Sequence, residues 1–308
     1  MSDLNTITHL WTTPQQPSRV VVLGSSGFTG AGLLRHLTSR SIETLAVSSA
    51  QVDLCQPESV ALLQRMVRRD DALIITSALT PDKGRDVHTL MKNLMMGQHL
   101  SQFLQGAGSC AHVIYLSSDA VYADDLSLIR ERSSASPTTY HGLMHLARER
   151  MVSQATTAST IPLLVLRPCA LYGANDTHNG YGPNRFVRSA LTDGAIVLFG
   201  QGEEERDHLF IDDLCDVMMR GLMQRSAGVL NVATGCAVSF GELANRIAAL
   251  CEEPVRIDCR ARQSPITHRH FDTTALIRAF PAFKTTPLSE GLSKMLDALA
   301  PRETALRP

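Results

Sequence analysis

The 308-residue sequence predicts an α/β protein built on a doubly wound parallel sheet, with a smaller C-terminal lobe, and two observations carry this prediction. Short apolar runs alternate with longer amphipathic segments between Arg19 and Pro168, which is the pattern of parallel strands joined by crossover helices. The first run leads through Gly24, Gly27 and Gly30 directly into a helical segment. A strand that turns on glycines into a helix lets a pyrophosphate approach the backbone and the free N–H groups of the helix.

The elements of the first half follow from this alternation. The expected strands are apolar, as buried parallel strands are: Val20–Leu23, Thr44–Val47, Ala72–Thr76, His112–Ser117 and Leu163–Arg167. The expected helices are Ala31–Thr38, Pro57–Arg68, Val87–Gly106 and Leu143–Ala155. In a Rossmann-type sheet of this kind, ligands bind beyond the carboxyl ends of the strands. The chemistry is therefore expected just after strands, at Gly24–Gly30, Ser48–Leu54, Thr76–Leu79 and Ser117–Tyr122.

The second half has a different composition. Residues Cys169 to Asn184 are rich in Gly, Asn, Tyr and Pro, which favours a loop that faces a substrate. Beyond it we expect a strand and two helices, the last capped by Ser239: Ala195–Phe199, Asp212–Gln224 and Phe240–Cys251. The predicted organisation is an N-terminal arm, a dinucleotide-binding domain and a substrate-binding lobe: residues 1–18, 19–168 (with 203–235 partly returning to it) and 169–308.

Composition excludes several classes of partner. The formal net charge is −1 and the charged residues, 19% of the chain, form no long runs, which argues against nucleic acid or an anionic membrane as the main partner. We expect neither a targeting leader nor a membrane-spanning segment. Seven cysteines without paired spacing indicate free thiols in a reducing cytoplasm. The histidines lack metal-like spacing and Glu203–Glu205 is interpreted as a solvated loop, so no metal is expected.

Two further motifs carry a family resemblance. The segment Ser117-Ser118-Asp119-Ala120-Val121-Tyr122 follows an expected strand, and Tyr140-His141-Gly142-Leu143-Met144-His145 opens a helix. With the glycine turn, they resemble the extended short-chain dehydrogenase/reductases, the group of NAD-dependent nucleotide-sugar epimerases and dehydratases. The resemblance continues in the family's order through Leu166–Gly173, Gly182–Phe186, Leu198–Gly202, Arg206–Asp213 and Gly228–Ala233.

The resemblance implies an enzyme that binds NAD or NADP together with a nucleoside-diphosphate sugar. The expected reaction is epimerisation through a transient keto sugar, with a hydride passing to the nicotinamide and back. Reduction or dehydration of the sugar nucleotide is the alternative reaction, and a weakly catalytic NAD(P)-binding sensor or scaffold is the alternative of another class. The family also implies a homodimer, formed through Val87–Gly106 and the helix after Gly142.

The active site of that family combines a Ser or Thr, a Tyr and a Lys four residues after the Tyr. A phenol has a pKa near 10, and a nearby cation favours the phenolate that can act as a base. The resemblance assigns the hydroxyl role to Ser118 and the base to Tyr140. Four residues after Tyr140 stands Met144, which supplies no cation.

A second alignment of the same helix is possible. If the helix is aligned on Leu146-Ala147-Arg148-Glu149, His141 takes the tyrosine place and His145 the lysine place. Residues four apart share a helix face. Tyr140 and His145 converge only if Tyr140 precedes the regular helix, or if the helix contains a one-residue bulge. We favour this alignment, with His145 as the anchor of the cofactor ribose and Tyr140, or else His141, as the acid/base.

The choice between NAD and NADP stays open. Ser48 and Ser49 stand where NAD-binding relatives usually carry an acidic residue for the adenosine ribose. Asp53 follows shortly after, and its alternative role is that of a turn residue. The resemblance assigns the following residues to the cofactor: Gly24, Ser26, Gly27, Phe28, Thr29, Gly30, Ser48, Ser49, Asp53, Leu54, Thr76, Ser77, Ala78, Asn93, Ser117, His145, Arg167 and Pro168.

Arg206 is the residue expected to bind the diphosphate of the substrate, because a guanidinium matches phosphate geometry and keeps its charge. The alternative for Arg206 is an ion pair with Asp207 or Asp213. The residues that the resemblance assigns to the substrate are Ser118, Asp119, Tyr172, Asn184, Arg185 and Arg206.

Overall fold

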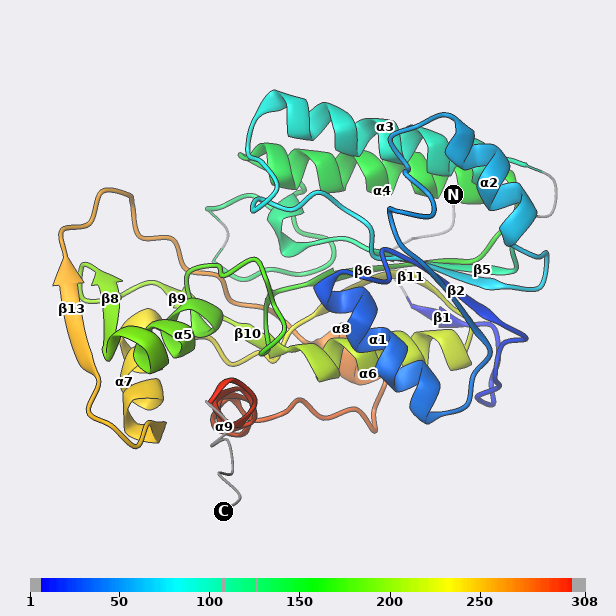
Figure 1. Ribbon diagram of the computed structural model, residues 1–308. Coiled ribbons are helices and arrows are strands. Elements are labelled where there is room, and N and C mark those ends of the chain that lie inside the picture. Colours follow the sequence, from blue (N-terminus) through cyan, green and yellow to red (C-terminus); the bar gives the residue numbers. More distant parts are fainter. Residues whose placement is uncertain (1–6, 107–108, 126, 301–308) are drawn as a thin grey trace, which may run out of the picture.

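The computed structural model describes residues 7–106, 109–125 and 127–300, and it confirms the predicted α/β fold (Figure 1). The central sheet consists of β1 (Thr8–His9), β2 (Val20–Leu23), β3 (Thr44–Val47), β4 (Ala72–Ile75), β5 (His112–Leu116), β6 (Leu163–Pro168) and β11 (Ser226–Val232). Its order is β1-β11-β6-β5-β4-β2-β3, and only β1 pairs antiparallel. The chain order reverses at β2, which lies between β3 and β4, and ligands bind at such a switch point.

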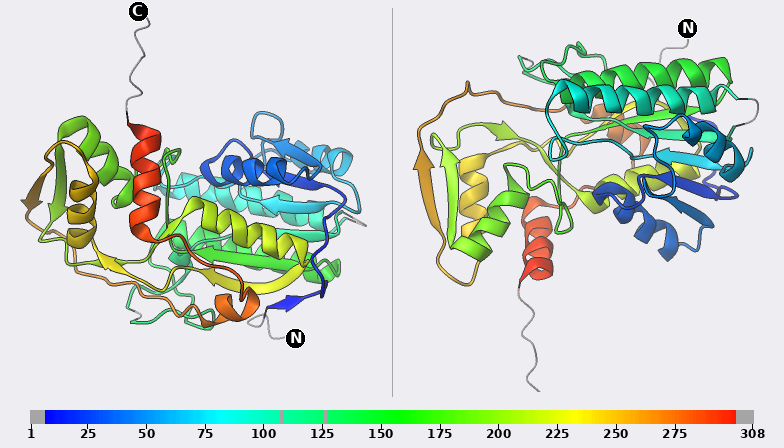
Figure 2. Two further views of the ribbon diagram at one scale, coloured as in Figure 1. Left: turned by 90° about the horizontal axis from the view of Figure 1, so that it is seen from below. Right: turned by 45° about the horizontal axis from the view of Figure 1, so that its top comes forward.

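Helices cover both faces of this sheet (Figures 1 and 2). One layer contains α1 (Phe28–Ser39) and α6 (Ile211–Met223), and the other contains α2 (Glu58–Met66), α3 (Val87–Leu104) and α4 (Tyr140–Ala158). Alternate residues of β2 face the two layers: Val20 packs in one core with Leu33, and Val21 packs in the other with Leu100. Because both faces are buried, the strand is a continuous apolar run rather than an alternating one.

The C-terminal half adds a smaller group of elements beside one end of the sheet (Figure 1). Its larger elements are α5 (Pro183–Asp193), β8 (Ala195–Phe199), α7 (Phe240–Leu250), β13 (Arg256–Arg260) and α9 (Leu288–Leu299). The short helix α8 (Thr274–Ala279) also belongs to the C-terminal half, but it packs against β11 of the central sheet. Its short strands form two pairs, β7 (Ala170–Tyr172) with β10 (His208–Phe210) and β9 (Glu205–Arg206) with β12 (Val238–Ser239). A 3-10 turn, η1 (Asp119–Val121), follows β5.

Helix starts differ most from the sequence prediction. The structure begins α1 at Phe28 rather than Ala31, and it begins α4 at Tyr140 rather than Leu143. The early start of α4 has a local cause, because the Thr139 hydroxyl accepts a hydrogen bond from the Gly142 N–H at 3.1 Å. The predicted cap of α7 is confirmed, since the Ser239 hydroxyl accepts from the Glu242 N–H at 3.0 Å.

The two ends of the predicted organisation are only partly described. Residues 1–6 of the predicted arm and 301–308 of the predicted lobe lie outside the described residues. The described part of the arm contains β1, which pairs with β11, and β11 itself lies within the main sheet. The division of the chain into domains stays a prediction. Among the described residues, none of the helices combines the length and the hydropathy needed to cross a membrane.

Candidate functional site

The turn between β2 and α1 has the geometry of an anion site. Gly24 has a φ of +86°, and a Cβ placed on it would lie 2.7 Å from the backbone nitrogen of Ser77. A Cβ on Gly30 would lie 2.2 Å from the Gly24 carbonyl oxygen, so both positions require glycine. Gly27 caps α1 without a side-chain hydrogen bond, and the first turn contains no acidic residue. The first N–H groups of α1 are therefore left for a ligand, and the helix dipole favours a negative charge there.

Unpaired polar atoms surround this turn. Thr76 uses its hydroxyl to bind the Leu23 carbonyl at 2.9 Å and so ties the end of β4 to the end of β2. Within the described part of the chain, the Oγ atoms of Ser77 and Ser117 and the Nδ1 atom of His145 are buried and have no hydrogen-bond partner. A buried polar atom is costly unless a partner satisfies it. These atoms fit a polar ligand that lies across the ends of β4 and β5.

The end of β3 shows how the predicted ribose-binding residues are used. Ser48 bonds to the Gln51 side chain through both its N–H and its hydroxyl, and Ser49 is exposed. The Asp53 carboxylate accepts the Cys55 N–H at 2.9 Å, which is the arrangement of a turn residue. Leu54 is buried, and its carbonyl oxygen lies 2.8 Å from Nδ1 of His99. The contacts of Asp53 are therefore those of a turn residue, which was the alternative role considered for it.

The start of α4 brings two histidines together beside η1. Gly142 allows this approach, because a Cβ on it would lie 2.0 Å from the Ala120 carbonyl oxygen. The rings of His141 and His145 meet edge to face, with their centroids 4.7 Å apart. Tyr140 is the first residue of a regular α-helix and its side chain is 48% exposed. Neither condition for convergence of Tyr140 with His145 is met, but Tyr140 lines one cavity together with His141, so it stays a candidate for the acid/base.

Both histidines of this pair are held neutral. Burial, and then the nearby positive charges of His178 and Arg85, lower the pKa of His141 to about 4. Burial lowers the pKa of His145 well below its usual range, with contributions from His141 and Arg148. A neutral imidazole has one acceptor nitrogen and one N–H donor. His145 can therefore bind ribose hydroxyls, but it does not supply the positive charge of a lysine.

A buried cation lies one helical turn further along α4. Arg148 is fully buried, and its guanidinium donates to the Ser77 carbonyl at 2.8 Å and to Oδ1 of Asn93 at 3.2 Å. It also lies over the Tyr115 ring. Arg148 belongs to the helix motif Leu146–Glu149, and the sequence predicted no role for it. In the sequence, Arg148 is an arginine on the same helix face as His141 and His145. That position alone does not distinguish a buried arginine from a solvated one.

Arg167 has a different position from the one expected. We predicted that it binds the cofactor, but its guanidinium forms a two-point ion pair with Glu149 at 2.9 and 2.6 Å and donates to the Tyr122 hydroxyl. A buried pair of this kind satisfies the guanidinium within the protein. Arg167 therefore anchors α4 to β6.

The predicted cofactor residue Asn93 also acts inside the protein. Its side chain bonds both to the N–H and to the carbonyl of Leu79, at 3.0 Å each, and accepts from Arg148. It therefore holds the loop that follows β4. The other residues that we assigned to the cofactor lie in the glycine turn (Ser26), at the start of α1 (Phe28 and Thr29), in the loop after β4 (Ala78) and at the end of β6 (Pro168).

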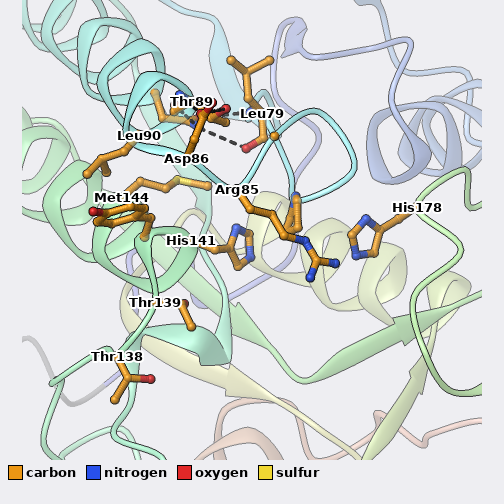
Figure 3. Close-up of a pocket in the computed structure, with 14 residues that line it drawn as sticks. Leu79, Arg85, Asp86, Thr89, Leu90, Thr138, Thr139, His141, Met144 and His178 are labelled. Carbon is orange, nitrogen blue, oxygen red and sulfur yellow. Dashed lines mark hydrogen bonds between the residues drawn. The ribbon is translucent and has the colours of Figure 1, made fainter.

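A cavity of about 550 Å³ opens between the loop after β4, the start of α3 and the start of α4. Figure 3 shows His141, Arg85 and His178 pointing toward the same space. Met144 and Leu90 supply apolar walls, and the residues that line the cavity include neither Ser118 nor the glycine turn. The cavity therefore extends the site on the side of the histidine pair.

A second cavity, of about 220 Å³, lies against η1. Asp119 and Arg206 line it together with Arg269. Arg206 forms neither of the ion pairs considered for it, because its guanidinium binds Glu204 at 3.4 Å and the hydroxyl and carbonyl of Thr267. Burial lowers the pKa of Arg206 and raises that of Asp119. Ser118, which precedes Asp119, caps η1 by accepting the Ala120 N–H at 3.1 Å.

Two residues assigned to the substrate have structural positions instead. Tyr172 is fully buried, and a Cβ on Gly291 of α9 would lie 2.0 Å from its hydroxyl oxygen, so the ring packs under α9 rather than facing a sugar. Asn184 is buried, and its amide binds the Gly173 N–H at 3.0 Å and the Asp176 carboxylate at 2.5 Å. Arg185 is exposed. Of the residues assigned to the substrate, Asp119 and Arg206 are the ones that line a common cavity.

Solved structures share this fold. The UDP-N-acetylglucosamine 4-epimerase from Methanobrevibacter ruminantium, in complex with UDP-N-acetylmuramic acid, gives a TM-score of 0.82 at 18% identity over 92% of this chain and 98% of that chain. The UDP-glucose 4-epimerase from Thermus thermophilus, in complex with NAD, gives 0.79 at 17% identity over 91% and 98%. RMD from Pseudomonas aeruginosa, complexed with NADPH, gives 0.78 at 23% identity over 91% and 98%.

A family model identifies the chain more directly. The model of the NAD dependent epimerase/dehydratase family matches residues 20–233, which is more than half of the chain. The expected nicotinamide dinucleotide cofactor is thereby confirmed at the level of the family. Because the match runs from the start of β2 to the end of β11, the chain belongs to the NAD dependent epimerase/dehydratase family.

Proposed function

We propose that this protein is a nucleotide-sugar epimerase that acts through a transient keto sugar. The observation that carries the proposal is the neutral pair of His141 and His145, which packs beside the Ser118 turn at the ligand edge of the sheet. Two of the similar structures are named as 4-epimerases of UDP-glucose and of UDP-N-acetylglucosamine, which supports this substrate class.

The cofactor fits the unpaired groups at this edge. NAD, when bound, supplies the hydride acceptor and donor. The glycine turn and the N-terminus of α1 would hold its pyrophosphate, and Ser77, Ser117 and His145 would satisfy their unpaired atoms on its remaining polar groups. NADP is the alternative, because the end of β3 presents Ser48 and Ser49 and no carboxylate that would repel a 2′-phosphate.

We assign the acid/base role to His141. Its ring lines the cavity, whereas His145 lies behind it and orients it through the edge-to-face contact. Burial lowers the pKa of His141 to about 4, so its ring is neutral near pH 7 and has an acceptor nitrogen for the proton of the sugar hydroxyl. Neutral His141 then accepts the proton of the sugar hydroxyl as the carbonyl forms, and returns it when the hydroxyl is restored.

Arg206 would bind the diphosphate. Its guanidinium borders the same cavity as Asp119. Because burial removes part of its hydration, an anionic group bound in this cavity would stabilise its charge. This arrangement lets the nucleotide sit in the C-terminal part of the chain while the sugar reaches η1.

The experiment is a thermal-shift and turnover measurement on the purified full chain. We expect NAD or NADP to raise the melting temperature, and a member of a panel of UDP-, dTDP- and GDP-sugars to raise it further. NMR of the sugar should show an epimerised product while the absorbance of the cofactor is unchanged after many turnovers.

The other outcomes separate the competing functions. Stoichiometric consumption of reduced cofactor indicates a ketoreductase, and loss of water from the sugar indicates a dehydratase. Stabilisation by cofactor but by no sugar nucleotide favours a sensor or scaffold. No affinity for either coenzyme overturns the proposal.

A further inference from the structure

Two histidines and a glutamate that are far apart in the sequence meet at the surface of the C-terminal half. Glu205 lies on β9, and His268 and His270 lie on the segment that returns from β13 toward α8 (Figure 1). One ligand atom from each of the three lies within 4.8 Å of the others. We call these three residues the His268 cluster. The cluster lines an open cavity of about 590 Å³, together with Asp124 and Asp125.

Backbone pairing explains why the three side chains converge. The Arg269 N–H donates to the Glu205 carbonyl at 3.0 Å, which sets the segment alongside β9. Side chains of an extended segment alternate between its two sides. His268 and His270 therefore share the side of the open cavity, and Arg269 points to the other side, where it binds Asp124 at 2.6 Å.

The distances within the His268 cluster are those between ligands of one metal ion. Oε2 of Glu205 lies 3.4 Å from Nδ1 of His268 and 3.0 Å from Nε2 of His270. Ligand atoms about 2.0–2.1 Å from a tetrahedral zinc ion are separated from one another by about 3.3 Å. A shared cation would therefore need only small side-chain movements.

We propose that the His268 cluster binds one divalent transition-metal ion, of which Zn²⁺ is the best match. Imidazole and carboxylate ligands suit Zn²⁺, and three protein ligands leave a fourth position for water or for another ligand. The carboxylate of Asp125 adds negative charge on the same cavity, whereas that of Asp124 is paired with Arg269. A bound ion would cross-link the returning segment to β9, directly beside Arg206 and its partner Thr267.

The sequence alone does not indicate this arrangement. Glu205 is separated from His268 by more than sixty positions along the chain, so no motif spacing joins them. Only the return of the segment from β13 brings the three residues together.

The test is a titration of the tag-free full chain with Co²⁺ and Zn²⁺. We expect one equivalent of Co²⁺ to produce visible d–d absorption bands, and Zn²⁺ to displace it. The variants His268→Gln, His270→Gln and Glu205→Gln should each weaken binding by more than about tenfold, because even groups behind a metal ligand typically contribute 10–100-fold. Zn²⁺ should also raise the melting temperature of the wild type but not of these variants.

The control is His36→Gln. His36 also lies beside a carboxylate, with Nε2 3.5 Å from Asp212, but it does not belong to a cluster of three ligands. This variant should bind one equivalent as tightly as the wild type. The proposal is overturned if the wild type binds no stoichiometric ion, or if all the variants bind as the wild type does. Circular dichroism checks that each variant is folded, and any one folded variant of the cluster suffices.

Discussion

The guanidinium of Arg148 donates to the backbone carbonyl of Ser77 across 2.8 Å and so links the middle of α4 to the end of β4. Replacing Arg148 with Met leaves that carbonyl and the Asn93 side chain without this donor. We expect the free energy of unfolding to fall by about 2–4 kcal/mol, since each unsatisfied buried group costs about 1–3 kcal/mol. Urea unfolding measures this loss.

The same variant tests whether Arg148 positions the cofactor site. At a temperature where Arg148→Met is fully folded, we expect the Kd for the coenzyme to rise about tenfold, because Ser77 borders the glycine turn. Arg150→Met, an exposed position on the same helix, is the control and should change neither quantity. A loss of stability with an unchanged Kd would reduce Arg148 to a purely structural residue.

The assignment of the acid/base role to His141 predicts the effects of three substitutions. Substitution His141→Ala should lower kcat by at least about 100-fold, the usual contribution of a general acid/base. Tyr140→Phe should change kcat less, because that side chain is half exposed, although it lines the same cavity as His141. Substitution His145→Ala should mainly raise the Kd for the coenzyme. If Tyr140→Phe abolishes turnover while His141→Ala does not, the assignment is reversed.

Arg206 is expected to act in substrate binding. Its replacement by Met should raise the KM for the sugar nucleotide by about 10–100-fold, which corresponds to a charge-assisted hydrogen bond of about 1.5–3 kcal/mol. The kcat should change less. Arg260→Met, at an exposed arginine of β13, should leave KM unchanged. Steady-state kinetics with both variants decide the question, and an unaltered KM for Arg206→Met excludes the role.

Buried histidines predict a stability that falls in mild acid. Burial lowers the pKa of His112 to about 4 and that of His208 to about 3, both below the value near 6.5 of the unfolded chain. The unfolded state therefore binds more protons, and stability is lost as the pH falls below 6.5. At pH 4, His112 alone removes about 3 kcal/mol.

Urea unfolding between pH 7.5 and 4.5 measures this slope. We expect His112→Gln to flatten it, because Gln does not titrate. Substitution of the exposed His88 by Gln should leave the slope as it is in the wild type. Equal slopes for all three proteins would contradict the prediction.

The outer helices support the proposed homodimer. Along α3, Val87, Met91 and Met95 are exposed by 58, 51 and 41%, and their spacing of four residues places them on one face. This helix lies beside α4 on the outside of the molecule (Figure 2). We expect a dimer in analytical ultracentrifugation, and a monomer for Met91→Asp combined with Met95→Asp. The control is Ile277→Asp on α8, because Ile277 is an equally exposed apolar residue that does not belong to this face of α3. A monomeric wild type contradicts the proposal.

Local patterns determined the fold class and the anion site. The apolar run Val20–Leu23 with its glycines predicted both β2 and the turn into α1, because buried parallel strands and close backbone approaches restrict the residues that fit. The cap of α7 at Ser239 was readable for the same reason, since its hydrogen bond closes within three residues.

Only the tertiary structure decided which side chains meet. The sequence predicts Arg167 beside the cofactor, but in the structure its guanidinium binds Glu149 and Tyr122. The sequence likewise predicts Tyr172 as a substrate residue, but in the structure α9 packs on its ring. The His268 cluster likewise depends on the return of a distant segment to β9. Strand runs, glycine turns and caps depend on neighbours in the chain, whereas these contacts depend on where separate elements pack, and that is set by the whole core.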